Sequence, residues 1–412
     1  MLELLSKSIK LSINLIFTLL LVSSFKVSAE TRAQEDILRE QVILNGFKPA
    51  DQLYQNPHPN LAKVGKVIFE STALSLNGNI SCRTCHQDKF GSADGIPNAA
   101  AILGEGVGPD RLLSGAKLLP RNTLPFWGRG AKDFNAFFWD GRVSKEDTKI
   151  ISQFGSKPPS EDIMVVADHL PVVEIREMLD DDEFVEKNKV ESVENSQKVY
   201  KAIVNNLIKK EPKASKQIAD YFQKDLKSLT YKDYAQSLAA FVRSEFRIKE
   251  TKLERFAYKK EPLSKKELQG GLIFYGTGKC ITCHSGPHFS DFKYHNVAFP
   301  QLGFGKNGFG VDYGRYNTTF NTNDMYKFRT APLFNVEKTS PYGHSGSVVD
   351  MKSAIYAHFD PLRLVDVSKM SALKRNDLYR RMSFSKETAE RVGFLTDEDV
   401  ENLVSFLKTL SF

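Results

Sequence analysis

Apolar residues recur at helical spacing in several parts of the chain. Within residues 196–258, one stripe of a long helix is formed by Tyr234, Leu238, Phe241 and Val242. The pattern returns after the capping residue Thr396, where the apolar stripe is Val400, Leu403, Val404, Leu407 and Leu410. Alternating patterns typical of strands are scarce. The sequence therefore predicts a mainly α-helical protein with long loops and little strand.

The four cysteines of the chain all fall in two CxxCH segments, at residues 82–86 and 280–284. In such a segment two thiols can form thioethers with one haem, and the following histidine becomes a ligand of its iron. A redox disulfide or a shared zinc ion explains the pattern less well, because each cysteine pair is followed by a histidine. We predict two covalently bound haem c groups, attached through Cys82, Cys85, Cys280 and Cys283, with His86 and His284 as proximal iron ligands.

Similar glycine-led segments precede both sites, GKVIF at residues 65–69 and GGLIF at residues 270–274. This similarity indicates an internal repeat of a cytochrome c-like unit. The second unit begins with Ser264 and Glu267, which have the spacing of a capping box.

The repeat predicts two haem domains. We expect residues 30–190 to form an N-terminal cytochrome c domain, and residues 191–412 to form a helical connector and a C-terminal cytochrome c domain. Residues 32–60 are expected to be a polar lead-in, because packing signals begin only after them. Residues 87–130 are rich in glycine, proline and alanine, which predicts loops over the first haem.

The first 29 residues have the features of a signal peptide. Lys7 and Lys10 precede an apolar run that ends at Val22, and residues 27–29 form a small-residue cleavage signature. The run is short for a membrane span, and no later stretch approaches the roughly 20 apolar residues that spanning requires. An exported chain with all its cysteines in CxxCH segments fits a periplasmic cytochrome.

The charge of the chain adds little to this picture. Residues 1–29 contain three lysines and one glutamate, so their removal lowers the formal charge from +7 to +5. A small positive excess without a basic run and interleaved aromatic residues argues against a nucleic-acid partner. The 383 residues that remain are enough for two or three domains.

From about Leu61 to its end, the chain resembles the bacterial di-haem cytochrome c peroxidases and their MauG-type relatives. The resemblance is carried by residues 74–81 (LSLNGNIS), 121–123 (RNT), 138–142 (FWDGR), 239–243 (AAFVR), 285–291 (SGPHFSD), 328–330 (FRT) and 339–347 (TSPYGHSGS). It implies an N-terminal haem that meets peroxide and a C-terminal haem that stores or relays an electron. It also implies a calcium ion between them, bound in part by the backbone carbonyls of Thr339 and Pro341. A simple loop turn is the alternative for this last segment.

Residues 87–163 contain no histidine, methionine, tyrosine or cysteine, so the first iron should be open to hydrogen peroxide on its distal side. Cleavage of peroxide needs a side chain that moves a proton between the two oxygens. Family members have a glutamate a few residues after FWDGR. This offset falls on Asp147, with Glu146 beside it, and the resemblance implies that one of them is catalytic. Two solvated acids at the start of a helix are the alternative.

Two further residues near FWDGR are candidates for a role. Trp127 lies eleven residues before Phe138, the spacing at which MauG-type members place a tryptophan between the haems. The resemblance implies that it relays an electron hole, and an ordinary buried tryptophan is the alternative. Arg142 is expected to pair with an aspartate or a haem propionate, because a guanidinium matches carboxylates bidentately.

The distal ligand of the second iron is predicted to be His358. Asp350 can cap a helix in which Met351, Ala354, Ile355 and His358 share one face, which directs the histidine toward the apolar haem. The corresponding ligand is methionine in typical peroxidases and tyrosine in MauG, so histidine departs from both. A packed core histidine is the alternative, and His344, Met325 or Met370 would then be the ligand.

Together these features predict a periplasmic peroxidase that reduces hydrogen peroxide to water with electrons from a small soluble cytochrome c or copper protein. The alternative is a MauG-type enzyme that uses peroxide-derived high-valent haem to oxidise tryptophan or tyrosine residues of a partner protein. A pure electron carrier is disfavoured, because the first iron lacks a local distal ligand. The sequence leaves the oligomeric state open, with a homodimer as one option.

Overall fold

The computed structural model describes residues 30–54, 58–179, 193–306, 310–391 and 394–412. The predicted signal peptide lies outside these residues. Helices dominate the described chain and strands form only two small sheets, which confirms the predicted fold class. None of the described helices has the length and apolar character needed to cross a membrane.

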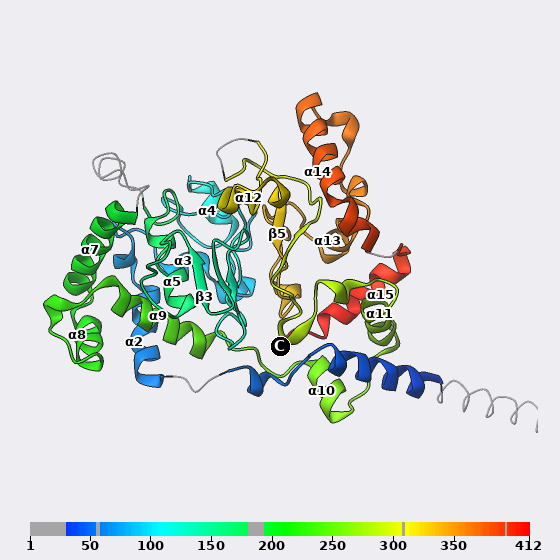
Figure 1. Cartoon of the computed structure of the whole chain (residues 1–412), viewed down its shortest axis with the longest axis horizontal. Helices are drawn as coiled ribbons and strands as arrows, with labels where there is room; N and C mark the ends of the chain where they lie inside the picture. The colour runs from blue at the N-terminus through cyan, green and yellow to red at the C-terminus, as the bar shows by residue number, and fades with distance from the viewer. Residues whose placement is uncertain (1–29, 55–57, 180–192, 307–309, 392–393) are drawn as a thin grey trace, which may run out of the picture.

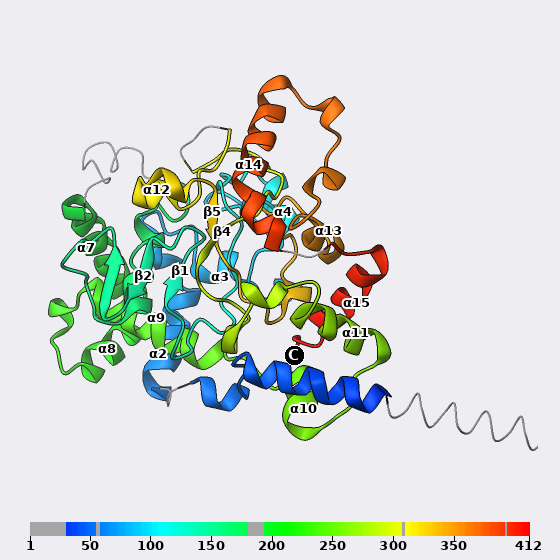
Figure 2. The ribbon, with the colours of Figure 1, turned by 45° about the vertical axis from the view of Figure 1, so that its right-hand side comes forward.

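Figure 1 shows the helices arranged in two groups, with the first group on the left and the second on the right. An unlabelled helix spans residues 30–44. The first group contains α2 (Pro59–Glu70), α3 (Cys82–Cys85), α4 (Pro109–Leu113), α5 (Ile163–Ala167), α7 (Val193–Lys210), α8 (Pro212–Tyr221) and α9 (Tyr231–Glu245). The second group contains α10 (Lys252–Lys259), α11 (Lys265–Tyr275), α13 (Met351–Tyr356), α14 (Ala372–Arg391) and α15 (Asp397–Lys408). The short helix α12 (Tyr316–Thr319) lies apart from it, on the side of the first group in Figure 2.

In the first group, α2 and α9 cross in very close contact. The crossing point is Gly65, where an added Cβ would lie 1.9 Å from the carbonyl oxygen of Ser237 and 2.9 Å from the Cβ of Phe241. Only glycine lets two helix backbones approach this closely. The crossing therefore depends on Gly65.

The second group repeats this crossing with α11 and α15. A Cβ at Gly270 would lie 1.9 Å from the carbonyl oxygen of Asn402 and 2.8 Å from the Cβ of Phe406. The clashing residues are four apart on α15, as they are on α9 in the first group. This shared geometry confirms the internal repeat. The capping box predicted at Ser264 is present at the start of α11, and the predicted cap Thr396 begins α15, where it forms a capping box with Asp399.

The strands lie in two antiparallel sheets. The first has the order β1 (Ala136–Phe137), β2 (Val143–Glu146), β3 (Lys149–Ser152). The second pairs β4 (Tyr294–Asn296) with β5 (Lys327–Arg329), with His295 opposite Phe328. Both sheets follow a CxxCH segment and shape the loops that surround it.

The prediction of a polar lead-in at residues 32–60 is wrong. Residues 30–44 form a helix whose Leu38 and Val42 are fully buried in the core of the second group. Figures 1 and 2 both show this blue helix beside α10, below the second group. Its two buried apolar residues are four apart, a weak signal that the surrounding polar residues hide.

The two hydrophobic cores also indicate where the chain passes from the first unit to the second. Helices α7, α8 and α9 contribute their apolar faces to the same core as α2, and the second core begins again at Ile248. The connector helices thus pack with the first haem unit. The domain limits 30–190 and 191–412 remain a prediction, and packing places the change of core near residue 247.

Candidate haem centres and the residues around them

The first CxxCH segment folds as one helical turn. Ser81 and Thr84 form a capping box at its start, and the turn ends at His86. One turn of helix places Cys82 and Cys85 on the same side, and neither cysteine is in a disulfide. The Nδ1 atom of His86 lies 2.9 Å from the carbonyl oxygen of Ser92, so Nε2 is left for another partner. Burial lowers the pKa of His86 to about 3, which keeps the imidazole neutral and able to bind a metal.

The second CxxCH segment has the same arrangement. His284 follows the short turn Cys280–Thr282, and its Nδ1 atom lies 3.0 Å from the carbonyl oxygen of Phe289. A carbonyl that holds Nδ1–H fixes the ring and directs Nε2 at the metal in many metal-binding histidines. Burial lowers the pKa of His284 to about 4. Both histidines are therefore prepared as ligands through Nε2.

A second imidazole faces His284. The ring centres of His284 and His358 are 6.4 Å apart. A metal–imidazole bond is about 2 Å long, so two imidazoles on opposite sides of one iron have ring centres about 6 Å apart. His358 follows α13, which is capped by Asp350 as predicted, and its Nδ1 atom is held 2.8 Å from the carbonyl oxygen of Ala354. The spacing thus fits one six-coordinate iron between the two rings.

The first site differs from the second in the side chains that surround its histidine. The ring neighbours of His86 are phenylalanines, with Phe126 at 4.0 Å and Phe69 at 6.4 Å between ring centres. Within the described ranges, no second imidazole faces His86. The two attachment sites share one local geometry and differ in what lies opposite the histidine.

The other histidines near the second site have different partners. His344 stacks on Phe328 at 3.9 Å between ring centres, and its Nε2 atom lies 2.8 Å from the side-chain oxygen of Gln301. His288 packs between Phe134 and Phe292. Neither ring is presented to His284.

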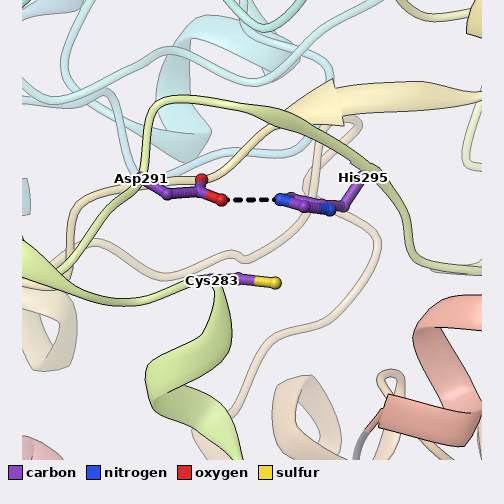
Figure 3. A group of neighbouring side chains, drawn as sticks. All are labelled: Cys283, Asp291 and His295. Carbon is purple, nitrogen blue, oxygen red and sulfur yellow. Dashed lines mark hydrogen bonds and ion pairs between the residues drawn. The ribbon is translucent and has the colours of Figure 1, made fainter.

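Figure 3 shows a third group beside the second attachment site, formed by Cys283, Asp291 and His295. Their ligand atoms lie within 4.8 Å of one another, close enough to hold a metal ion. A cysteine in a haem thioether is not available as a thiolate ligand, however, so haem attachment and this metal site exclude each other. His295 and Asp291 form an ion pair at 2.8 Å, and this hydrogen bond raises the pKa of His295 to about 9.

The structure places the predicted catalytic acids away from the interior. Glu146 and Asp147 lie at the turn of the β2–β3 hairpin, where both are exposed. Arg315 is the ion-pair partner of Glu146, at 3.7 Å. A peroxide acid-base catalyst must reach the enclosed side of a haem, so this position argues against the predicted role of either acid.

Two other acids lie near the first attachment site instead. The charges of Asp168 and Glu177 raise the pKa of the Cys82 thiol, in addition to the effect of burial. Burial and the nearby charge of Glu174 raise the pKa of Glu177 to about 7. Burial and the charge of Asp162 raise the pKa of Asp168 well above its usual range. Acids in this range can exchange protons at neutral pH.

Sequence reasoning missed both acids for a physical reason. Asp168 directly follows the apolar helix α5, which was a usable sign of a buried carboxylate. Glu177 carries no comparable local signal, because its partial burial depends on the packing of the neighbouring residues Val172, Met178 and Leu179 in the first core.

Trp127 lies between the two cores. Its ring packs edge-on against Phe246 of the first core, at 5.6 Å between centres, and against Phe412, at 5.0 Å. Phe412 packs on the second core. In both ribbon views the C-terminus lies between the two groups of helices, which agrees with this position.

Arg142 pairs with carboxylates, as expected from its place in FWDGR. Its Nη1 atom lies 3.1 Å from Glu174, and its Nε atom lies 4.0 Å from Asp140. The Nε atom is buried and donates no hydrogen bond to the part of the chain that the structure describes.

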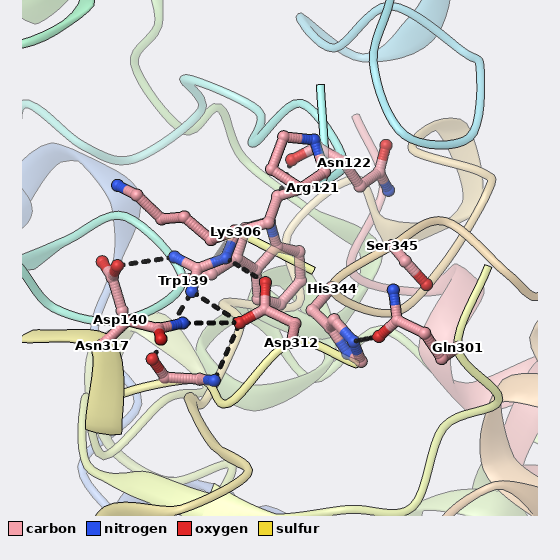
Figure 4. A network of polar contacts seen from close by, with 12 residues as sticks. Arg121, Asn122, Trp139, Asp140, Gln301, Lys306, Asp312, Asn317, His344 and Ser345 are labelled. Atoms are coloured by element: carbon pink, nitrogen blue, oxygen red, sulfur yellow. Dashed lines mark hydrogen bonds and ion pairs between the residues drawn. The ribbon is translucent and has the colours of Figure 1, made fainter. Parts of the chain in front are cut away.

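Figure 4 shows a buried ion network that joins the two halves of the chain. The guanidinium of Arg121 forms two hydrogen bonds to Asp312, at 2.7 and 2.9 Å, and one to Asp140, at 2.6 Å. Asp312 also accepts hydrogen bonds from Asn317 and from the backbone of Gly314. All three charged groups are nearly inaccessible to solvent.

The segment with the predicted calcium ligands adjoins this network. The amide of Asn122 donates a hydrogen bond of 2.6 Å to the carbonyl oxygen of Pro341. Thr339 lies two residues earlier in the same loop, and its methyl group closely approaches Gly91 of the first unit. The loop that holds Thr339 and Pro341 thus contacts the first half of the chain at Asn122 and at Gly91.

The residues present fit two haem c groups. Each site offers two unpaired thiols and a neutral imidazole with a free Nε2 atom. Several buried polar atoms have no partner among the described residues, as expected for groups that contact a prosthetic group. These atoms include Trp127 Nε1, Arg129 Nη2, Arg142 Nε and Tyr294 Oη.

Comparisons with known proteins agree with this geometry. The family described as "Di-haem cytochrome c peroxidase" matches residues 59–262. MauG of Methylorubrum extorquens is 24% identical over 358 residues, covering 85% of this chain and 78% of MauG. Cytochrome c551 peroxidase of Pseudomonas aeruginosa is 26% identical over 388 residues, covering 92% and 88%.

The fold is shared with solved structures. The diheme peroxidase BthA of Burkholderia thailandensis aligns with a TM-score of 0.61 at 18% identity, over 89% of both chains. A MauG-like protein associated with microbial copper homeostasis aligns with a TM-score of 0.60 over 89% of this chain and 92% of that one. With its two haem-binding units and these relatives, the chain belongs to the di-haem cytochrome c peroxidase and MauG family of oxidoreductases.

Proposed function

We propose that this protein is a di-haem peroxidase that reduces hydrogen peroxide to water with electrons from a small soluble redox protein. The observation that carries the proposal is the difference between the two histidines: His284 faces His358, whereas His86 faces no second imidazole within the described chain. An iron with one protein ligand can bind peroxide, and an iron with two can only exchange electrons. The two sites thus suit the two halves of a peroxidase reaction.

Different residues of the chain would serve peroxide binding, electron relay and proton transfer. Cys82, Cys85 and His86 would hold the first haem, which supplies the iron that binds peroxide. Cys280, Cys283, His284 and His358 would hold the second haem as an electron relay. Glu177 is our candidate for the proton transfer between the peroxide oxygens, because a carboxyl group with a pKa of about 7 can both accept and release a proton at neutral pH.

We also propose a calcium ion at the junction of the two units. Calcium prefers oxygen ligands, including backbone and amide carbonyls. The carbonyls of Thr339 and Pro341 and the side-chain oxygen of Asn122, after rotation of its amide, offer such ligands from both halves of the chain. Removal of calcium with a chelator should lower the thermal unfolding temperature of the parent protein, and Asn122→Ala should reduce this effect.

Export to the periplasm is part of the proposal, because the first 29 residues have the features of a signal peptide. Cell fractionation with detection of covalent haem tests this point. Haem in the cytoplasmic fraction would count against it.

A MauG-type activity is the second candidate, and the position of Trp127 favours it. An indole that contacts Phe246 on one side and Phe412 on the other links the two cores. Such a link can carry an electron hole between the haems, and the stored oxidising equivalents can then oxidise tryptophan or tyrosine of a partner protein. In a peroxidase the same contact simply shortens the path for electrons.

Steady-state kinetics separate the two candidates. Peroxide turnover is measured with reduced cytochrome c and, separately, with a reduced copper protein as donor. A peroxidase consumes peroxide and oxidises two one-electron donors per peroxide. Negligible turnover, together with a long-lived oxidised state after peroxide addition, would favour the MauG-type activity.

A further inference from the structure

Two buried arginines at the junction of the cores lack an acidic partner. Arg129 is 8% exposed and Arg329 is 3% exposed. Neither forms an ion pair with an acid within the described ranges, whereas Arg121 and Arg142 nearby both do. A buried charge without a counter-charge costs several kcal/mol, so such a pair indicates a missing anion.

The two side chains are held in place by neutral contacts, which leave one donor atom of Arg129 without a partner in the described chain. The guanidinium of Arg129 lies over the ring of Phe126, at 4.9 Å from its centre, and its Nη2 atom has no partner in the described chain. Arg329 donates from Nε to the carbonyl oxygen of Phe138 at 3.0 Å, and lies beside the ring of Phe134. Neutral contacts position both groups and neutralise neither.

The two guanidiniums are close enough to influence each other. Burial and the nearby charge of Arg329 together lower the pKa of Arg129 to about 9, against the opposite effect of the charge of Asp168. Burial lowers the pKa of Arg329 to about 10. Arg129 and Phe134, the aromatic neighbour of Arg329, line one cavity of about 440 Å³. Arg129 thus lines the cavity itself, whereas Arg329 lies behind it, against the ring of Phe134.

We propose that Arg129 and Arg329 form a binding site for one carboxylate at the junction of the two cores. Two sources of this carboxylate exist. A propionate of the first haem is favoured by position, because Phe126 contacts both Arg129 and His86. A small free carboxylate is the other source, since Lys132 also lines the cavity, whereas Arg243 in the same lining is already paired with Asp162. Guanidinium groups bind carboxylates of either origin through paired hydrogen bonds.

The inference rests on the haem attachment in the proposed function, and its test avoids peroxide turnover. Arg129→Gln, Arg329→Gln and the conservative Arg129→Lys are compared with the parent and with Arg363→Gln, an exposed arginine paired with Asp397. Haem content per chain is measured first, so that failure of attachment is recognised separately. Resonance Raman spectra then report the propionate bending bands, and a redox titration reports the potential of each haem.

If a propionate is bound, both glutamine variants shift the propionate bands. The equilibrium constant for reduction of the first haem falls about tenfold in them, or about 59 mV for one electron. Arg129→Lys shifts the bands less, and Arg363→Gln leaves them unchanged. If a free carboxylate is bound, the propionate bands stay unchanged, and added acetate shifts the first-haem spectrum saturably in the parent but not in Arg129→Gln. Unchanged bands together with no response to acetate overturn the proposal.

Discussion

The two haem-binding units share their scaffold and differ in the face opposite the proximal histidine. Each scaffold is a helix pair that crosses at a glycine, Gly65 in one unit and Gly270 in the other, with the added Cβ 1.9 Å from a carbonyl oxygen in both. Each histidine is oriented by one backbone carbonyl. In the second unit His358 stands opposite, whereas in the first unit the acids Asp168 and Glu177 lie nearby. The helix crossing and the carbonyl that holds the histidine thus position each haem site in the same way. The residues opposite the histidine, which come from other segments, determine whether the iron has a second protein ligand.

The largest effect is expected at the acids of the first unit. Glu177→Gln should slow peroxide cleavage by roughly 10²- to 10⁴-fold, because the amide cannot move the proton. Rapid mixing with peroxide, followed at the absorbance band of the first haem, measures this rate. In the parent the rate should rise with pH through about 7, the pKa of Glu177, as the carboxylate becomes available to accept a proton.

Asp147→Asn is the matched control, since Asp147 is an exposed acid at the turn of the β2–β3 hairpin. Its rate should equal that of the parent. A loss of rate in Asp147→Asn with none in Glu177→Gln would restore the role predicted from FWDGR.

The second largest effect is expected in the buried network of Arg121, Asp140 and Asp312, which joins the two units. Arg121→Gln should lower the free energy of unfolding by about 3–5 kcal/mol, because it leaves the buried carboxylates of Asp140 and Asp312 without their partner. Urea denaturation followed by circular dichroism measures the change. Arg363→Gln removes an exposed arginine and should leave the midpoint in place. A similar midpoint for both variants would show that the network does not couple the units.

The helix crossings offer a direct comparison of the two scaffolds. Gly65→Ala and Gly270→Ala should each lower the free energy of unfolding by about 1–3 kcal/mol, because the new Cβ forces the helices apart. Gly310→Ala is the control, since an added Cβ there meets nothing within 4 Å. If only one crossing variant is destabilised, the two scaffolds are not equivalent.

The smallest effect concerns the ion pair beside Cys283. The hydrogen bond to Asp291, with a smaller contribution from the Cys283 thiol, raises the pKa of His295 to about 9, above its usual value of 6.5. The stabilisation is therefore complete below about pH 6.5 and is lost as the pH rises through 9. His295→Gln should be about 1 kcal/mol less stable than the parent at pH 6 and nearly equal to it at pH 10. An equal difference in stability between His295→Gln and the parent at pH 6 and at pH 10 would show that His295 and Asp291 do not form a charged pair.

Local patterns in the sequence were sufficient for features that depend on a few neighbouring residues. The CxxCH segments and the helix capped by Asp350 are of this kind, and the structure brings His358 to face His284. Counting residues from FWDGR leads to Glu146 and Asp147, which a hairpin places at the surface, and their catalytic role stays a prediction. Glu177 could not be predicted, since its partial burial arises where its neighbours Met178 and Leu179 pack into the first core.

The packing partners of whole helices were also hard to predict, because they lie far away in the sequence. The helix at residues 30–44 precedes the first unit in sequence and packs on the second in space. No local pattern records which core such a helix joins. The connector helices α7, α8 and α9 likewise pack with the unit that precedes them.

The difference between the two irons is tested most directly by electron paramagnetic resonance of the oxidised protein. His86 as sole protein ligand gives a high-spin ferric signal, and the pair His284 and His358 gives a low-spin signal. The parent should show both in equal amounts, and His358→Ala should convert only the low-spin signal. Two low-spin signals in the parent, or a low-spin signal that survives in His358→Ala, would contradict this assignment of the two sites.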